Sequence, residues 1–439
     1  MTAAVAAAAP ETGESPAFLQ AVADLGRTRQ VTTSEAIYNA QGIKLLEGGA
    51  RVDQGLYERL VSHRLARPLD ECVDAEPSVD AKVLREAASA AFERWPFFAR
   101  TAPAGRTREI VLEAIAAVPL PKPVGLHLML ARDTRPALFE HSILAALLCA
   151  HLAREGGASL REISTAAAAG LLHDMGMLHI DPGLLDADER LSGDRLRPVY
   201  AHPITASMLI GRFAEYPREI VRAVVEHHEK LDGSGYPRGL QGAAVSPLGR
   251  VLSLAEVVTA MFDGEREHPE QRVSLLLRIN PQRYDAALVP SIHRLLRDAT
   301  APEAGAGGPA QQSIERLLRL ADQLESWRET SEQLESELDG AHVALLRSVS
   351  EQNATLQRML YEAGITREQL GALGEGLDDD SAVRIELWAL AEELLWQLHA
   401  AANQLKRRWR ATGPALEHPA ALAAWLKSVE ALDETPGAA

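Results

Sequence analysis

Two pairs of adjacent side chains that can bind metal ions lie in the middle of this chain. His173 and Asp174 occur together in LLHDMG, and His227 and His228 occur together in EHHEKLDGSGYP. Neutral imidazole binds borderline transition metals such as iron, manganese or zinc, and an ionised aspartate can place one oxygen on each of two ions. Because adjacent side chains on a helix diverge by about 100°, one pair can serve two metals. The spacing predicts a metal centre assembled across several helices, with His202 between the two pairs.

The chemistry open to such a centre is displacement at phosphorus. Two divalent ions about 3.5 to 4 Å apart can share a hydroxide, polarise a phosphoryl oxygen and stabilise the leaving oxygen of an in-line displacement. One histidine alone in an apolar helix is more often a structural core or cap residue, since a buried imidazole is costly unless it is paired or metallated. Several candidate ligands in one helical region favour metal binding over that alternative.

The segment after the second pair has the composition of a tight loop. Gly233 and Gly235 allow the chain to turn sharply, and Pro237 sets the exit of the DGSGYP segment. An ordinary loop would explain DGxG alone. Here two histidines stand shortly before Asp232, which ties the loop to the predicted metal centre.

These motifs together resemble the HD-GYP domain, over about residues 125 to 298 of the chain. The resemblance is carried by the HD pair, the histidine pair and the loop, namely His173, Asp174, His227, His228, Glu229, Asp232, Gly233, Gly235, Tyr236, Pro237, Gly239 and Leu240. In that family the fold is an all-α HD-superfamily bundle, and the usual activity is hydrolysis of cyclic di-GMP to linear pGpG or GMP. The resemblance therefore implies a metal-dependent cyclic di-GMP phosphodiesterase.

The resemblance also implies which residues hold metal and substrate. The implied metal ligands are His141, His173, Asp174, His202, His227, His228 and Glu256, with His173 and Asp174 as the catalytic pair. We expect two divalent transition-metal ions, iron or manganese first and zinc as an alternative. The implied substrate contacts are Asp232, Gly235, Tyr236, Pro237 and Arg250. Two of these have structural alternatives: Tyr236 can pack the loop, and Arg250 can pair with Glu256 or Asp232.

Two positions depart from the family pattern. Met177 stands where the family commonly continues HDxGK with a lysine, so a cation that could contact a substrate phosphate is missing. Glu256 stands where the family has aspartate, and its extra methylene displaces the carboxylate unless the helix or the metal shifts. A lost charge-assisted contact costs about 1.5 to 3 kcal/mol, which slows turnover without removing a metal ligand. A second hypothesis is therefore a catalytically degenerate domain that acts as a cyclic di-GMP receptor or interaction scaffold.

Other residues near the motifs fall outside the expected ligand set. Ala137 occupies the position where some family members hold a third metal with glutamate, so we expect a two-metal site. His127, His151 and His179 do not match the register and are expected to be surface or packing residues. A third hypothesis, an HD-type phosphohydrolase for another nucleotide, is disfavoured by the intact GYP loop.

Mostly helical segments must position these side chains. Apolar residues recur three and four apart in FEHSILAALLCAHLA, LREISTAAAAGLLHDMG and REIVRAVVEHH. We expect a mainly α fold, in which an all-α HD-superfamily core follows a small α+β N-terminal module and precedes a C-terminal helical or coiled-coil region. The expected parts are a disordered tail at 1–15, the α+β module at 16–75, a helical connector at 76–124, the HD-GYP domain at 125–298, a linker at 299–312 and the C-terminal helices at 313–439.

The composition excludes several classes of partner. Lys and Arg total 45 against 61 for Asp and Glu, and the net charge of −16 predicts no attraction for nucleic acid polymer or anionic membrane. The leucine-rich stretch at 143–153 is shorter than the roughly 20 apolar residues that a membrane span needs. The two cysteines, Cys72 and Cys149, lie far apart and predict no disulfide framework, which favours a cytoplasmic location.

The C-terminal region carries a heptad-like apolar pattern. Its members are Leu317, Leu320, Leu324, Trp327, Leu334 and Leu338, with Ser331 at the missing position. Such a stripe can form a homodimer or bind a protein partner, and an intramolecular helical bundle can bury it equally well.

Overall fold

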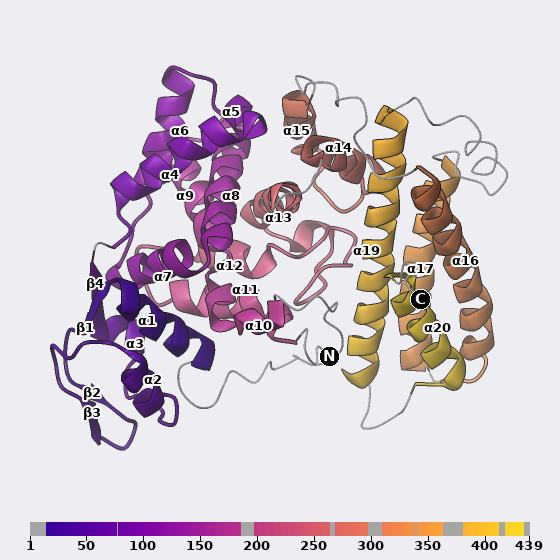
Figure 1. Cartoon of the computed structure of the whole chain (residues 1–439). Helices are drawn as coiled ribbons and strands as arrows, with labels where there is room; N and C mark the ends of the chain where they lie inside the picture. Colours follow the sequence, from indigo (N-terminus) through magenta and orange to yellow (C-terminus); the bar gives the residue numbers. More distant parts are fainter. Residues whose placement is uncertain are drawn as a thin grey trace. The chain divides into compact units, whose positions relative to one another are not determined.

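The computed structural model describes residues 15–76, 78–185, 197–263, 268–296, 310–338, 340–362, 381–411 and 418–433. The chain divides into two compact units (Figure 1). Unit 1 is Met1–Glu265 with Gln282–Asp298, and unit 2 is Arg266–Pro281 with Ala299–Ala439. Nearly all of the expected N-terminal tail and linker lies outside the described residues. Residues 310–312, expected in the linker, belong to helix α16 (Ala310–Glu335), whose apolar pattern extends back to its first turns.

The N-terminal module combines short helices with two small antiparallel sheets. Strand β1 pairs with β4, and β2 pairs with β3. In the β2–β3 hairpin, the Asn39 side chain accepts hydrogen bonds from the amides of Gln41 and Ile43, and Gly42 takes a positive φ of 79°. The elements are α1 (Pro16–Thr28), β1 (Gln30–Thr33), β2 (Ile37–Tyr38), β3 (Lys44–Leu46), α2 (Gln54–Leu60), α3 (Leu69–Cys72) and β4 (Val73–Glu76).

The rest of unit 1 is helical and surrounds α8 (Pro136–Glu155), which is buried along most of its length. It packs most extensively on α9 (Leu160–Leu172), where Gly170 permits close approach: a Cβ there would lie 2.6 Å from the carbonyl oxygen of Ala145. The other elements are α7 (Lys122–Thr134), η1 (Met175–His179), α10 (Pro182–Leu185), α11 (Arg197–Ile210), α12 (Arg218–Glu226), η3 (Gly242–Ala244), α13 (Pro247–Thr259), η4 (Ala260–Phe262) and α15 (Val289–Leu296). The predicted mainly α fold is confirmed.

The predicted helical connector packs against this core. Its helices are α4 (Ala81–Arg94), α5 (Pro96–Thr101) and α6 (Arg106–Ala116). Helices α4 and α6 contact each other, and both contact α8. Residues 81–116 therefore belong to the same packed body as the histidine-bearing helices.

Helix α8 is longer than the leucine-rich stretch suggested. Among the described residues, it is the one helix long and apolar enough to cross a membrane by length and composition. Most of its apolar stretch is buried inside unit 1, as expected of a core helix. Length and composition alone are weak support for a span, and α8 carries His141 into the interior.

Unit 2 is a helical bundle that buries its own heptad-like stripe. Leu317, Leu320, Leu324, Trp327 and Leu334 all lie in its apolar core. Helix α16 packs on α17, α19 and α20 of the same chain, so the stripe is covered without a second copy. The remaining elements are α14 (Pro269–Ile279), α17 (Gly340–Glu362), α19 (Ser381–Ala411), α20 (Ala420–Glu430) and η6 (Ala431–Asp433).

Candidate metal centre

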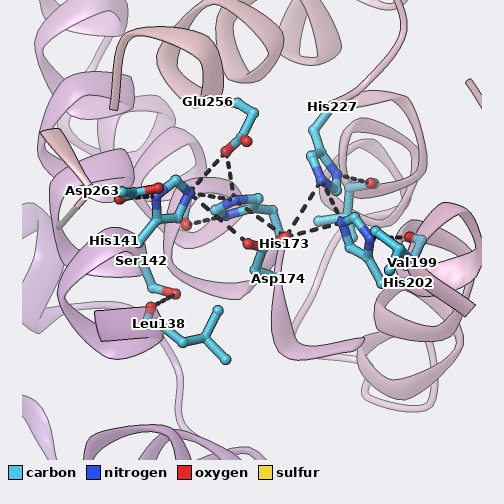
Figure 2. Close-up of polar contacts among 12 residues, drawn as sticks. Leu138, His141, Ser142, His173, Asp174, Val199, His202, His227, Glu256 and Asp263 are labelled. Carbon is cyan, nitrogen blue, oxygen red and sulfur yellow. Dashed lines mark hydrogen bonds and ion pairs between the residues drawn. The ribbon is translucent and has the colours of Figure 1, made fainter. Parts of the chain in front are cut away.

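The structure brings the seven predicted metal ligands together in two groups inside unit 1. Within each group the candidate ligand atoms lie within 4.8 Å of one another. We call the first the Asp174 group, which contains Asp174, His202, His227 and His228. We call the second the Glu256 group, which contains His141, His173 and Glu256. Figure 2 shows members of both groups facing a common region, with Asp174 between them.

Helix ends supply the two adjacent pairs. His173 is the C-terminal cap of α9 and Asp174 is the N-terminal cap of η1, while His227 is the C-terminal cap of α12. His202 lies in the second turn of α11, directly before Pro203. The close packing of η1 on α11 explains this placement, since a Cβ on Gly176 would lie 2.2 Å from the carbonyl oxygen of His202.

Three histidines are oriented by the same local contact. In each of them Nδ1 donates to the backbone carbonyl three residues earlier in the chain. The distances are 2.7 Å from His173 to Gly170, 2.5 Å from His202 to Val199 and 2.6 Å from His227 to Val224. A neutral ring with its proton on Nδ1 has a lone pair on Nε2, so all three rings present a ligand nitrogen.

The Nε2 atoms converge at distances that suit a shared cation. They lie 3.1 Å apart in His202 and His227, and 3.3 Å apart in His141 and His173. Two facing lone pairs repel each other, and a cation between them removes that repulsion. In the Glu256 group, Oε2 of Glu256 lies 2.9 Å from Nε2 of His141 and 3.0 Å from Nε2 of His173. The longer side chain of Glu256 therefore reaches the other two ligands of its group.

Asp174 lies between the two groups. Its Oδ1 is 3.1 Å from Nε2 of His202 and 3.5 Å from Nε2 of His227. Its Oδ2 is 4.0 Å from Nε2 of His141, a member of the Glu256 group. Oδ1 is buried and forms no hydrogen bond. A buried carboxylate oxygen without a donor is costly, and a bound cation would satisfy it.

The pKa shifts favour anionic carboxylates in both groups. Burial opposes ionisation of Asp174 and Glu256, but the imidazoles around them hold the pKa of each carboxyl well below its ordinary value. His173 acts most strongly on Asp174, and His141 on Glu256. Both carboxylates are therefore ionised at neutral pH, as ligands to a divalent cation must be.

The histidine pKa values differ between the groups. Burial lowers the pKa of His227 to about 4 and that of His228 well below its ordinary value, so both rings are neutral and can bind a metal. Burial acts the same way on His141 and His173, but nearby carboxylates reverse it. Glu256 and Asp263 raise the pKa of His141 well above its ordinary value, and Asp174 and Glu256 raise that of His173. Protons thus occupy the Glu256 group when no cation does.

The residues present fit a divalent transition metal. The donor set consists of imidazole nitrogens and carboxylate oxygens, which suits iron, manganese or zinc. The Nδ1 contacts supply the supporting hydrogen bonds that metal-bound histidines commonly have.

The residues of the GYP loop that were predicted to contact the substrate also pack the loop itself. The ring of Tyr236 stacks on His228, with centroids 4.5 Å apart and planes at 20°, and meets the edge of Tyr200 at 4.6 Å. Gly235 lies where a Cβ would be 2.5 Å from the carbonyl oxygen of His228. The Tyr236–Pro237 peptide bond is cis. The structural alternative for Tyr236 is therefore the one observed, and substrate contact by Gly235, Tyr236 and Pro237 stays a prediction.

Arg250 and Asp232 also have structural partners. The guanidinium of Arg250 donates to Asp285 at 3.1 Å and to the carbonyl oxygen of Val245 at 3.0 Å. Asp232 accepts from the amide and hydroxyl of Ser234 and pairs with Arg283 at 3.2 Å. The expected pairing of Arg250 with Glu256 or Asp232 was wrong, because the chain after the loop brings Asp285 to the guanidinium.

Three buried or partly exposed carboxylates support the centre although the ligand prediction did not include them. Glu229 accepts from the amides of Arg238 and Leu240 at 2.7 and 2.9 Å, which closes the GYP loop. Glu226, fully buried, accepts from the amide of Ser246 at 2.8 Å and joins the end of α12 to the start of α13. Asp263 contacts His141. Glu229 belongs to the recognised motif, whereas no local signal marks the other two.

The remaining histidines and Met177 lie outside both groups. His127, His151 and His179 are packing residues, and two of them, His127 and His179, each stack on Phe18 of α1 at 4.7 Å and lie 5.7 Å from each other. Met177 is in η1, where its carbonyl oxygen accepts from Arg135 at 2.6 Å. The structure therefore places no cationic side chain at position 177 itself.

Comparisons with known proteins find relatives of this region. Residues 126–288 match the HD domain family. The chain is 35% identical over 127 residues to a 3'3'-cGAMP-specific phosphodiesterase of Vibrio cholerae, covering 28% of each protein. It is 32% identical over 112 residues to a cyclic di-GMP phosphodiesterase response regulator of Xanthomonas campestris, covering 25% of this chain and 30% of that protein. A cyclic di-GMP phosphodiesterase of Pseudomonas aeruginosa is 28% identical over 123 residues, covering 28% of this chain and 30% of that protein.

These matches show what the central region is similar to. Residues 126–288 are similar to the HD domain, which agrees with the resemblance of the motifs and the GYP loop to an HD-GYP domain. The chain spans less than a third of the length of each of these relatives.

Proposed function

We propose that this protein is a metal-dependent phosphodiesterase that hydrolyses cyclic di-GMP to pGpG, GMP or both. The observation that carries the proposal is the convergence of the two ligand groups on Asp174, inside a domain that matches the HD family. Named relatives of that domain act on cyclic di-GMP or on 3'3'-cGAMP, which supports a cyclic dinucleotide as substrate.

The proposed cofactors are two divalent transition-metal ions, iron or manganese. The Asp174 group would hold one and the Glu256 group the other, with the carboxylate of Asp174 facing both. When bound, such a pair supplies Lewis-acid activation of the phosphoryl group and of the attacking water.

The protein's own residues would prepare this chemistry by holding the ligands rigidly. The Nδ1 hydrogen bonds fix the tautomer and the plane of each ring, so Nε2 points into the centre before an ion arrives. Burial of the ligands keeps bulk water away and strengthens the electrostatic interactions within the site. The proposed roles of His173 and Asp174 as the catalytic pair follow from their position where the two groups meet.

A turnover assay tests the proposal directly. Metal-stripped full-length protein would be reloaded anaerobically with Fe²⁺ or Mn²⁺ and incubated with cyclic di-GMP and, separately, with 3'3'-cGAMP. We expect linear dinucleotide or mononucleotide from cyclic di-GMP, and no product with His227→Ala protein treated in the same way. Faster cleavage of 3'3'-cGAMP would correct the substrate. Failure to cleave either compound by protein shown to contain both ions would refute the proposal.

A second candidate is a catalytically degenerate receptor or scaffold, which Met177 favours because it provides no phosphate-binding cation. Glu256 supports it less, since its carboxylate reaches both histidines of its group. Turnover by Met177→Lys and Glu256→Asp proteins separates the two candidates. Binding of cyclic di-GMP without turnover in the wild type, with hydrolysis restored in either variant, would identify a receptor that has lost its activity.

A further inference from the structure

One ligand histidine is oriented differently from the others. Nδ1 of His141 faces a side-chain carboxylate, with Oδ1 of Asp263 at 2.9 Å, whereas the other three Nδ1 contacts go to backbone carbonyls (Figure 2). The two residues are 122 positions apart in the sequence. A carboxylate that accepts from a ligand imidazole fixes the ring and raises the basicity of its Nε2.

Asp263 is held in place by its neighbour in the chain. Phe262, which ends η4, is buried in a cluster of aromatic rings from the α4–α5 region. Its ring lies 5.0 Å from Phe97, 5.1 Å from Phe98 and 5.7 Å from Trp95. Edge-to-face and tilted packing of this kind restricts the position of η4 and hence of Asp263.

The α4–α5 region also fixes the position of His141, the partner of Asp263. Glu140, which directly precedes His141 in α8, accepts from Nε1 of Trp95 at 2.9 Å and from Arg94 at 3.0 Å. Trp95 therefore contacts the residue before His141 and the residue before Asp263. The segment expected to be a connector thus fixes both members of the His141–Asp263 pair.

We propose that Asp263 is a positioning residue that sets the affinity of the Glu256 group for a divalent transition-metal ion. Trp95 keeps His141 and Asp263 in contact by packing against the residue that precedes each of them. The inference deepens the proposed function, because the ion concerned is one of the two proposed cofactors. Asp263 acts through His141, so its removal weakens binding of the ion in the Glu256 group and leaves binding of the ion in the Asp174 group unchanged.

The first test measures metal binding without any nucleotide. Metal-stripped full-length protein is titrated with Mn²⁺ by calorimetry, for wild type, Asp263→Asn and Asp263→Glu. Asp74→Asn is the matched control, since the Asp74 side chain is 48% exposed and paired with Lys122, while that of Asp263 is 43% exposed. We expect Asp263→Asn to weaken one of two ions by about 10- to 100-fold, Asp263→Glu to recover part of this loss, and the control to match wild type.

Two further variants, each lacking one ligand of a single group, show which ion binds more weakly when Asp263 is changed. His228→Ala leaves the Glu256 group complete, and Glu256→Gln leaves the Asp174 group complete. Adding Asp263→Asn is expected to weaken Mn²⁺ binding in the first background and to have no effect in the second. Equal weakening in both backgrounds, or unchanged affinity in both, would overturn the assignment.

The role of Trp95 is tested separately with Trp95→Phe, which keeps an aromatic ring beside Phe262 and removes the donor to Glu140. We expect a several-fold loss of affinity at the same ion, and an unchanged affinity would remove Trp95 from the proposal. Thermal unfolding of each variant without metal checks that the fold is retained. Because no step uses a nucleotide, protein that binds two ions in this way but cleaves no cyclic dinucleotide would contradict the proposed function and leave the role of Asp263 intact.

Discussion

The two ligand groups are oriented by contacts of different range. In the Asp174 group, His202 and His227 are fixed by carbonyls three residues earlier in the same stretch of chain. In the Glu256 group, His141 depends on Asp263 and on Glu256, which are 122 and 115 residues away. The ring orientation of His202 and of His227 is set within a single helix or helix end, whereas that of His141 requires α13 and η4 to be docked on α8. Metal affinity in the second group is therefore sensitive to packing changes remote from the ligands.

The groups also differ in what they contain before a metal binds. Burial lowers the pKa of His227 and His228, which favours neutral rings, whereas the nearby carboxylates raise the pKa of His141 and His173 and favour their protonated forms. An ion entering the Glu256 group must displace protons, while an ion entering the Asp174 group meets free lone pairs at these two rings. We therefore expect the Asp174 group to fill first.

The largest effect is expected from Asp174, because it belongs to one group and faces the other. Asp174→Asn keeps the shape of the side chain and removes its charge. We expect a loss of about 100- to 1,000-fold or more in turnover, together with weakened binding of both ions. Metal content by elemental analysis and the rate of cyclic di-GMP cleavage measure the two effects. Weakening of a single ion would show that Asp174 serves one group alone.

Glu256 is expected to affect one group. Glu256→Gln removes the carboxylate that both His141 and His173 contact, so the ion of this group is expected to bind about 10- to 100-fold more weakly. Glu256→Asp keeps the charge and shortens the reach, and we expect a smaller loss. Mn²⁺ titration of both variants, with His228→Ala for comparison, measures these changes. A Glu256→Gln protein with wild-type affinities would exclude Glu256 as a ligand.

The pH dependence of metal binding separates the groups further. The pKa values of His141 and His173 lie above the ordinary value, so lowering the pH adds protons that compete with the ion of the Glu256 group. Its affinity is expected to fall by up to about tenfold per pH unit for each proton displaced, as the pH is lowered from neutral to about 5.5. His227, with a pKa of about 4, and His228 stay neutral over this range, so these rings give the Asp174 group a flatter dependence. Equal slopes for both ions in Mn²⁺ titrations would contradict the comparison.

The same difference in range explains what could be predicted from the sequence. Asp174, His227 and His228 lie in adjacent pairs at helix ends, so apolar periodicity and adjacency were sufficient to propose their convergence, with His202 between the pairs in the sequence. Glu256 was reached through the register of the family motif. Asp263 could not be found in this way, because it lies on the short turn after α13 and its partner is fixed by tertiary packing.

The sequence pattern also could not predict which helices and side chains pack against one another. The periodicity of residues 81–116 predicted helices, but the contacts of those helices with α8 depend on aromatic residues whose neighbours are far away in the chain. For Arg250 the sequence offered two nearby carboxylates, and the partner is Asp285, 35 residues later. In unit 2 the heptad pattern predicted a buried stripe, and the arrangement of α16, α17 and α19 shows that helices of the same chain bury it, while a homodimer or protein partner stays a prediction.

The smallest effect is expected from Tyr236, which stacks on a ligand of the Asp174 group without binding metal itself. Tyr236→Phe keeps the ring and its contact with His228, so metal affinity and turnover are expected to stay near wild type. Tyr236→Leu removes the stack, which is worth about 0.5 to 1.5 kcal/mol for aromatic pairs, and is expected to weaken the ion of this group by up to about tenfold. Mn²⁺ affinity and the KM for cyclic di-GMP would be measured for both variants. A raised KM in Tyr236→Phe with unchanged metal affinity would instead assign the hydroxyl to substrate binding, because the phenyl ring alone is sufficient to hold His228.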